Sequence, residues 1–103
     1  MIKVSILYPH GEGKKFDMTY YCNTHIPMVK QKLAAACKRV DVDQGLAGRQ
    51  PGSQPAFAAM AHICFDSVDA FQNAFAPHAA SFRADLPNYT DIEPIIQISE
   101  MKM

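Results

Sequence analysis

Residues 16–27 read FDMTYYCNTHIP, and this stretch decides the fold of the first half of the chain. Apolar residues recur at helical spacing through residues 18–37, which predicts a helix there with Asp17 as its N-cap. Pro27 lies inside this pattern, where it removes a backbone hydrogen bond and crowds a carbonyl one turn earlier. We therefore expect a kink at Pro27, or two abutting helical pieces.

Strand patterns flank this helix on both sides. Ile2, Val4 and Ile6 alternate with polar residues, which is typical of a strand with one buried face. Pro and Gly cluster in the segment QPGSQP after residue 48 and indicate a hairpin loop. The expected strands span residues 2–8, 39–48, 56–65 and 92–101.

A second helix is predicted between the third and fourth strands. Asp66 or Ser67 can cap it, and Pro77 interrupts it. Its apolar face holds Val68, Phe71, Phe75 and Phe82, and Leu86-Pro87-Asn88 ends it. The order of elements is then β-α-β-β-α-β, which indicates an α+β protein of the ferredoxin-like class, folded as a single domain over residues 1–103.

In that arrangement, four antiparallel strands form one sheet and both helices lie on one face. The other face then exposes Leu7, Met60 and Ile95 or their neighbours. A second copy of the same sheet would bury them, so we expect a homodimer.

The composition excludes several classes of partner. Ten basic residues balance ten acidic ones among the 103 residues, and no run of like charge occurs, so neither nucleic acid nor an anionic membrane is an expected partner. No apolar stretch has the form of a signal peptide or the length of a membrane span, which predicts a cytoplasmic protein. The three cysteines form no metal or disulfide pattern, and we expect them to be small buried residues.

Tyr21 and His25 are the leading candidates for a functional site. They lie four residues apart on one side of the predicted helix, where a phenol can hydrogen-bond and an imidazole can move a proton. Helical spacing puts His25 at the edge of the buried face. It either locks the kink at Pro27 by bonding a loop carbonyl or enters a cavity as an acid, base or hydrogen-bond donor.

Four more residues are candidates on weaker grounds. His78 faces the interior if the second helix is continuous, and a solvated shoulder if Pro77 resets the helical phase. Tyr8 and Tyr89 can line a pocket or pack at its rim, and Met28 can supply apolar lining. No nucleotide, nicotinamide or acyl-serine motif and no metal-ligand spacing occurs, so we expect no cofactor and no metal.

Three parts of the chain together resemble the EthD family (ethyl tert-butyl ether degradation) of the dimeric α/β-barrel superfamily. They are residues 16–27, the strand before them and the ending LPNYTDIEPIIQISE, and the resemblance is weakest over residues 39–53. Relatives share tyrosine, histidine and proline at the spacing of Tyr21, His25 and Pro27, which favours a functional role for that pair.

The resemblance implies a dimeric barrel with a ligand cavity between sheet and helices. It also implies an oxidoreductase role in the degradation of ethers or other xenobiotics. We therefore expect an enzyme for a small hydrophobic, oxygen-bearing molecule, with His25 in proton transfer, Tyr21 orienting the substrate, and His78 or Tyr89 on the other wall. The alternatives are a dehydratase or isomerase on the same fold, and a non-catalytic binding or carrier protein.

Overall fold

The computed structural model describes all 103 residues. Four strands form one antiparallel sheet in the order β2-β3-β1-β4. The strands are β1 (Ile2–Pro9), β2 (Arg39–Gln44), β3 (Phe57–Phe65) and β4 (Ile95–Glu100). The strand order and pairing confirm the predicted ferredoxin-like α+β fold.

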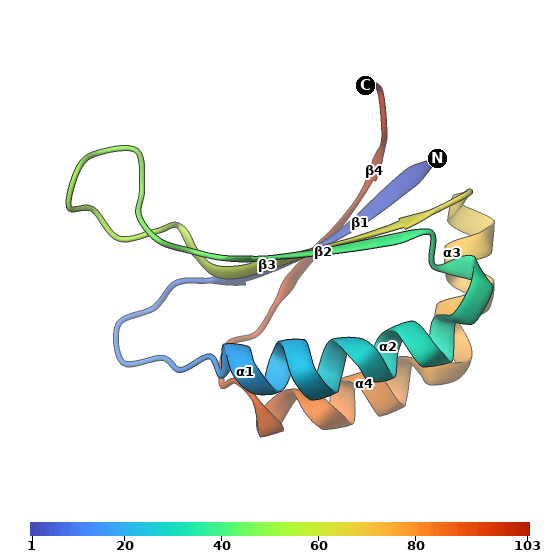
Figure 1. Cartoon of the computed structure of the whole chain (residues 1–103), viewed down its shortest axis with the longest axis horizontal. Helices are drawn as coiled ribbons and strands as arrows, with labels where there is room; N and C mark the ends of the chain where they lie inside the picture. The colour runs from blue at the N-terminus through green and yellow to red at the C-terminus, as the bar shows by residue number, and fades with distance from the viewer.

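Two helical segments cover one face of this sheet (Figure 1). The first comprises α1 (Met18–Tyr20), the π-helical turn η1 (Tyr21–His25), α2 (Ile26–Leu33) and the 3-10 turn η2 (Ala34–Ala36). The second comprises α3 (Val68–Phe75), η3 (Ala76–His78), α4 (Ala79–Asp85) and η4 (Leu86–Asn88). The side chain of Asp17 caps α1 and that of Ser67 caps α3, as predicted.

The core lies between the sheet and the helices. One buried cluster joins the start of β1 and the end of β3 to α2 and α4; it consists of Ile2, Val4, Val29, Leu33, Ile63, Phe65 and Phe82. A second cluster lies at the other end of the sheet and consists of Tyr8, Tyr21, Ile26, Ala59, Ala61, Tyr89 and Ile92. The alternation predicted for β1 is confirmed, since Ile2, Val4 and Tyr8 are buried on the helix side.

The first helical segment contains a π turn where the sequence predicted a kink or a break. The N–H of Ile26 donates to the carbonyl of Tyr21, five residues earlier, and Pro27 then begins the regular turns of α2. A π turn widens the helix, which moves the carbonyl that a helix-interior proline would otherwise crowd. The widening also changes the helical phase, so that Tyr21 and His25 are both buried and His25 is not at the edge of the buried face as expected.

Three element boundaries differ from the prediction. The second strand ends at Gln44 and not at residue 48, and Gly45 follows it where an added Cβ would collide with the carbonyl oxygen of Phe57. The last strand begins at Ile95 and not at residue 92, since Pro94 has no N–H for a ladder. The first helix gives way to a 3-10 turn at Ala34, which has a positive φ of 52°.

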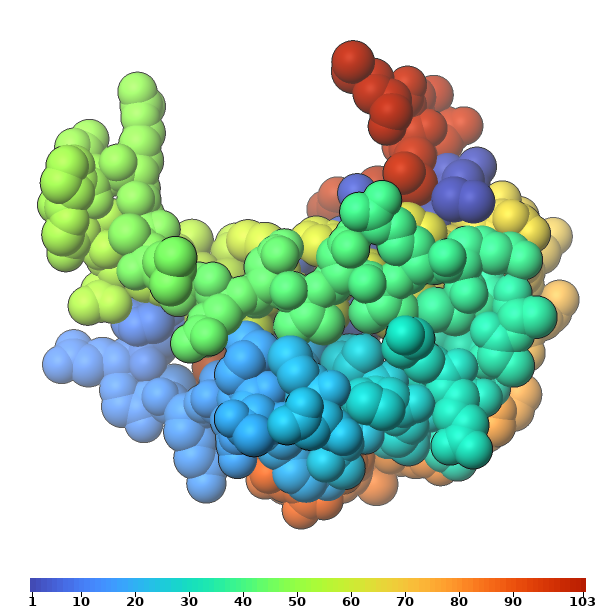
Figure 2. All heavy atoms as spheres, in the orientation of Figure 1, coloured from blue at the N-terminus to red at the C-terminus, as the bar shows by residue number.

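The outer face of the sheet has no cover within the chain. The β2–β3 loop and the C-terminus both rise on this side and leave the sheet open between them (Figure 2). His62 lies on this face and its Nδ1 is 2.8 Å from the hydroxyl of Ser5. On this face Ile95 of the edge strand β4 is 54% exposed and pairs with the half-buried Leu7, whereas Ile96 and Ile98 pair with Ile6 and Val4 on the helix side. No helix combines the length and the apolar character that crossing a membrane requires.

The cysteines do not all behave as expected. Cys64 is buried, Cys37 is half-buried and Cys22 is exposed. Cys22 follows the buried Tyr21 directly in the helical segment, and neighbouring helical residues point in different directions, so its side chain faces outward. The prediction of three buried thiols was therefore wrong for Cys22.

Candidate active site

A cavity of about 480 Å³ lies between the sheet and the two helical segments. Pockets of this size hold small organic ligands. Seventeen of its twenty lining residues are hydrophobic, so its walls favour an apolar molecule. Ile96 is 55% exposed and the Arg83 side chain 62% exposed, and both line the cavity. The cavity therefore opens to solvent beside β4.

Phenylalanine rings form the apolar end of the cavity. The ring centroids of Phe65, Phe71, Phe75 and Phe82 form a chain with steps of 5.2–5.4 Å, and all four rings line the cavity. Helical spacing on α3 places Phe71 and Phe75 on one side, and Phe65 reaches them from the end of β3. Such a wall offers aromatic contacts and no hydrogen-bond partner.

Tyrosine side chains form the polar end. The hydroxyls of Tyr8 and Tyr89 are 2.8 Å apart, in a buried hydrogen bond between β1 and the residue that follows η4. The ring of Tyr21 packs against both, at centroid distances of 5.6 Å from Tyr8 and 4.9 Å from Tyr89. Burial raises the pKa of all three phenols above the ordinary value, and it does so strongly for Tyr21 and Tyr89. At neutral pH they are therefore uncharged and able to donate hydrogen bonds.

His25 lies beside these tyrosines and also lines the cavity. Its imidazole stacks on Tyr21 at 5.4 Å and 14°, and its centroid is 4.6 Å from that of Tyr89. The residue is only 5% exposed. Nδ1 lies 2.8 Å from Oδ2 of Asp85 on α4, while Nε2 makes no hydrogen bond to another residue. No buried side-chain nitrogen or oxygen lacks a hydrogen-bond partner, so Nε2 retains accessible surface. The imidazole is thus held by a carboxylate and not by a loop carbonyl.

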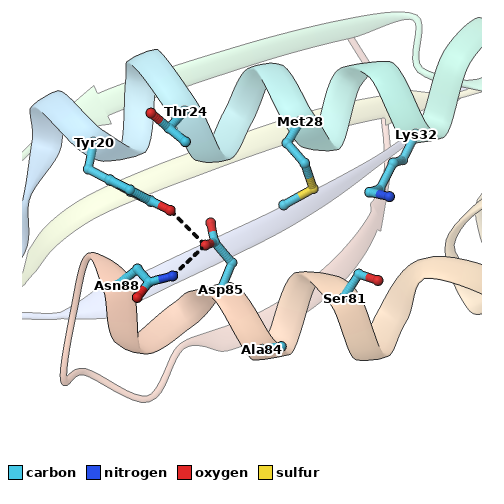
Figure 3. A pocket seen from close by; sticks show the side chains of 8 residues that line it. All are labelled: Tyr20, Thr24, Met28, Lys32, Ser81, Ala84, Asp85 and Asn88. Carbon is cyan, nitrogen blue, oxygen red and sulfur yellow. Dashed lines mark hydrogen bonds between the residues drawn. The ribbon is translucent and has the colours of Figure 1, made fainter.

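Asp85 is a site residue that the sequence analysis missed. Its second oxygen, Oδ1, accepts hydrogen bonds from the hydroxyl of Tyr20 at 2.7 Å and the amide of Asn88 at 2.9 Å (Figure 3). The position of Asp85 in its helix is a signal that the sequence contains. A carboxylate in the last turn of a helix lies against the negative end of the helix dipole, so its presence there indicates a partner elsewhere in the fold.

The predicted residues separate into two groups. Tyr8, Tyr21, His25 and Tyr89 come together around the polar end of the cavity. Met28 instead lines a groove on the outer side of the helix layer, between α2 and α4 (Figure 3). Met28 is half-buried there and also packs against the first core cluster, because it lies on the side of α2 that faces α4.

His78 flanks the cavity without lining it. The 3-10 turn at Pro77 changes the phase of the second helical segment, so that the next two residues, Ala79 and Ala80, line the cavity. The imidazole of His78 lies against Phe82, with ring centroids 6.0 Å apart.

One ion pair stands at the open side of the cavity. The guanidinium of Arg83 donates to both carboxylate oxygens of Glu93, at 2.6 and 2.8 Å. These hydrogen bonds raise the pKa of Arg83 and lower that of Glu93. Both side chains are more than 60% exposed, so water screens the pair. No group of three or more His, Cys, Asp or Glu side chains is placed to hold a metal ion.

Comparisons with known proteins agree on the family. The EthD domain matches residues 10–93. The chain is similar to an EthD-like protein from Ralstonia eutropha, with 47% identity, a TM-score of 0.96 and coverage of 99% of this chain and 92% of the other. An ethyl tert-butyl ether (EthD) family protein from Bacillus halodurans has 22% identity, a TM-score of 0.72 and 98% coverage of both chains.

A more distant structure shares the fold alone. SnoaB, a cofactor-independent oxygenase from Streptomyces nogalater, is 16% identical with a TM-score of 0.57, over 99% of this chain and 92% of its own. Comparison with curated proteins returned no match. The EthD match spans most of the chain and the Ralstonia eutropha protein is nearly half identical to it, so this protein belongs to the EthD family.

Proposed function

We propose that the protein is an enzyme that transfers a proton on a hydrophobic, oxygen-bearing small molecule bound in the cavity. The observation that carries this proposal is the environment of His25. Its imidazole is buried at the cavity wall, a carboxylate holds one ring nitrogen, and the other nitrogen makes no hydrogen bond to another residue and retains accessible surface. Histidine in such a position is suited to general acid–base catalysis.

The two ends of the cavity indicate how the molecule lies. Its apolar part packs against the phenylalanine rings, and its oxygen lies at the end where Tyr21, Tyr89 and His25 meet. Because burial keeps the tyrosines uncharged, they donate hydrogen bonds to a ligand oxygen and stabilise negative charge that develops there. Tyr21 orients the substrate in this scheme, and Tyr8 supports it through its bond to Tyr89.

The family association places an oxidoreductase role first, in the degradation of an ether or another xenobiotic. A dehydratase or isomerase would use the same proton transfer, so the residues described do not separate these reactions. The proton transfer at His25 is common to all three and is what the site supports directly.

We further propose that the enzyme acts as a cytoplasmic homodimer joined through its sheets. The outer face of the sheet is open, and on it Leu7 and Met60 are half-buried and Ile95 is 54% exposed. A second copy would bury them.

Paired binding and turnover measurements test the proposed chemistry. A panel of phenols, quinones, lactones and ethers is screened for binding by calorimetry and for turnover by product analysis. His25→Ala is expected to reduce turnover by about 100- to 10,000-fold with a small change in affinity, as is usual for loss of a general acid or base. Tyr21→Phe should also lower the rate, because it removes only the hydroxyl.

Two control histidines make the result specific. His10 is an exposed loop residue, and His10→Ala should leave both measurements unchanged. His78→Ala should have a smaller effect than His25→Ala, since His78 reaches the cavity only through Phe82. Ligand binding with no turnover in the wild type, and affinity changes alone in the variants, would refute the enzyme and favour a carrier.

A further inference from the structure

Asp85 stands where two hollows of the molecule meet. On one side, His25 contacts it from the wall of the cavity. On the other side is the groove between α2 and α4, of about 450 Å³, where Tyr20 and Asn88 contact it (Figure 3). The side chain of Asp85 is 16% exposed, so this carboxylate is shared between the water-accessible groove and the wall of the cavity.

The hydrogen bonds around Asp85 indicate its charge. Burial by itself would raise the pKa of Asp85, but hydrogen bonds from Asn88, His25 and Tyr20 outweigh burial and hold the pKa below its ordinary value. At neutral pH the group is therefore a carboxylate, which can only accept hydrogen bonds. Each of its three partners must then donate, and for His25 the donor is Nδ1.

This requirement determines which tautomer a neutral imidazole adopts. A neutral imidazole carries one proton, and a proton on Nδ1 leaves Nε2 with a free electron pair. The stacking of His25 on Tyr21 and its packing on Tyr89 hold the ring in this orientation. We propose that Asp85 is a positioning residue that keeps neutral His25 in the Nδ1–H form, so that Nε2 is the proton acceptor at the cavity wall.

The proton transfer then has a defined course, and this step rests on the proposed function. A proton leaves a ligand O–H or C–H bond and binds Nε2, while the electron pair of the broken bond stays on the ligand. The imidazolium that results lies 2.8 Å from the Asp85 carboxylate, which stabilises it as a charge-assisted pair. Return of the proton from Nε2 to the product restores the starting state.

Tyr20 and Asn88 support this arrangement from the groove. Both donate to Oδ1, which leaves Oδ2 for His25. The orientation of the carboxylate is thus set on the outer side of the helix layer, while its effect is exerted inside the cavity.

Nitrogen-15 NMR of the histidine rings tests the proposal without any substrate. In the ligand-free wild-type protein, at a pH where His25 is neutral, we expect a proton on Nδ1 and none on Nε2, read from the ¹⁵N shifts and ring couplings. In Asp85→Asn the amide can donate to Nδ1, so the proton should move to Nε2. Asp85→Glu retains a carboxylate and should restore the Nδ1–H form at least in part.

Control variants separate a change in the tautomer of His25 from a general disturbance of the structure. Asn88→Ala and Tyr20→Phe leave the carboxylate in place and should retain the Nδ1–H form, and His62 supplies an internal reference signal on the far face of the sheet. A wild-type His25 protonated on Nε2 would overturn the proposal even if every variant failed to fold. An unchanged tautomer in folded Asp85→Asn would also overturn it.

The test of Asp85 and the test of the proposed proton transfer have distinguishable outcomes. If the wild type has the Nδ1–H form and Asp85→Asn reverses it, the role of Asp85 stands on its own. Should no member of the ligand panel then shift the Nε2 signal, the proposed proton transfer fails while the positioning by Asp85 does not.

Discussion

Replacing Pro27 by alanine tests whether the π turn accommodates the proline. A proline in the interior of a regular α-helix costs about 3 kcal/mol relative to alanine. If Pro27 were under that strain, Pro27→Ala would raise the free energy of unfolding by a similar amount. In the structure, however, the bond from Ile26 to Tyr21 closes a π turn first, and Pro27 occupies the first turn of α2, where proline is tolerated.

Three smaller terms then determine the effect of the substitution. Alanine makes the unfolded chain more flexible, which lowers the free energy of unfolding by about 0.4–1 kcal/mol. A new N–H bond to an earlier carbonyl would raise it by about 0.5–1.5 kcal/mol. The third term, relief of any strain that remains at Pro27, is small. The sum lies within about 1 kcal/mol of zero, well short of the gain expected for a strained proline.

Urea unfolding followed by circular dichroism, at one fixed protein concentration, measures the change. Gln31→Pro is the matched control, because residue 31 is an exposed position inside α2 and the turn directly before it is regular α-helix. It should cost about 3 kcal/mol or more. A gain of about 2 kcal/mol or more in Pro27→Ala would refute the argument that the π turn relieves the proline.

Further predictions concern the buried hydroxyls, the carboxylate, the core and the assembly. Tyr89→Phe should lower the free energy of unfolding by about 1–3 kcal/mol, since it deprives the Tyr8 hydroxyl of its partner. The double variant with Tyr8→Phe should cost less than the sum of the two single changes, and strict additivity in urea unfolding would contradict the bond. The lowered pKa of Asp85 means that its contribution to stability is present above the pKa of the unfolded carboxyl and is lost as pH falls through the lower folded-state pKa. The unfolding free energies of wild type and Asp85→Asn should therefore differ at neutral pH and approach each other in acid; a difference that stays constant with pH would argue against this ionisation. Phe65→Ala removes a ring with 0% exposure and should cost about 3–5 kcal/mol in the same urea assay, with a loss under about 1 kcal/mol contradicting its place in the core. Ile95→Asp should shift the sedimentation equilibrium from dimer to monomer, because Ile95 is exposed on the outer face, and an unchanged dimer would show that β4 lies outside the interface.

The order of the elements could be predicted from the sequence because it depends on local patterns. Alternation in β1, helical spacing after Asp17 and the Ser67 cap are properties of neighbouring residues, and each is confirmed. Boundaries were less accurate where a contact between distant segments sets them. The second strand, for example, ends just before Gly45, where the carbonyl of Phe57 leaves no room for a Cβ.

The sequence by itself also identified Tyr21 and His25 as candidates, since a phenol and an imidazole four residues apart before a proline form a local pattern. The tertiary structure decided what they contact. His25 meets Asp85 across 60 positions of sequence and Tyr8 meets Tyr89 across 81. Local spacing carries no information about such pairs, because packing of both helical segments on one sheet brings them together. The π turn is another feature that regular helical spacing does not predict. It changes the helical phase, so that His25 lies at the cavity wall and not at the edge of the buried face.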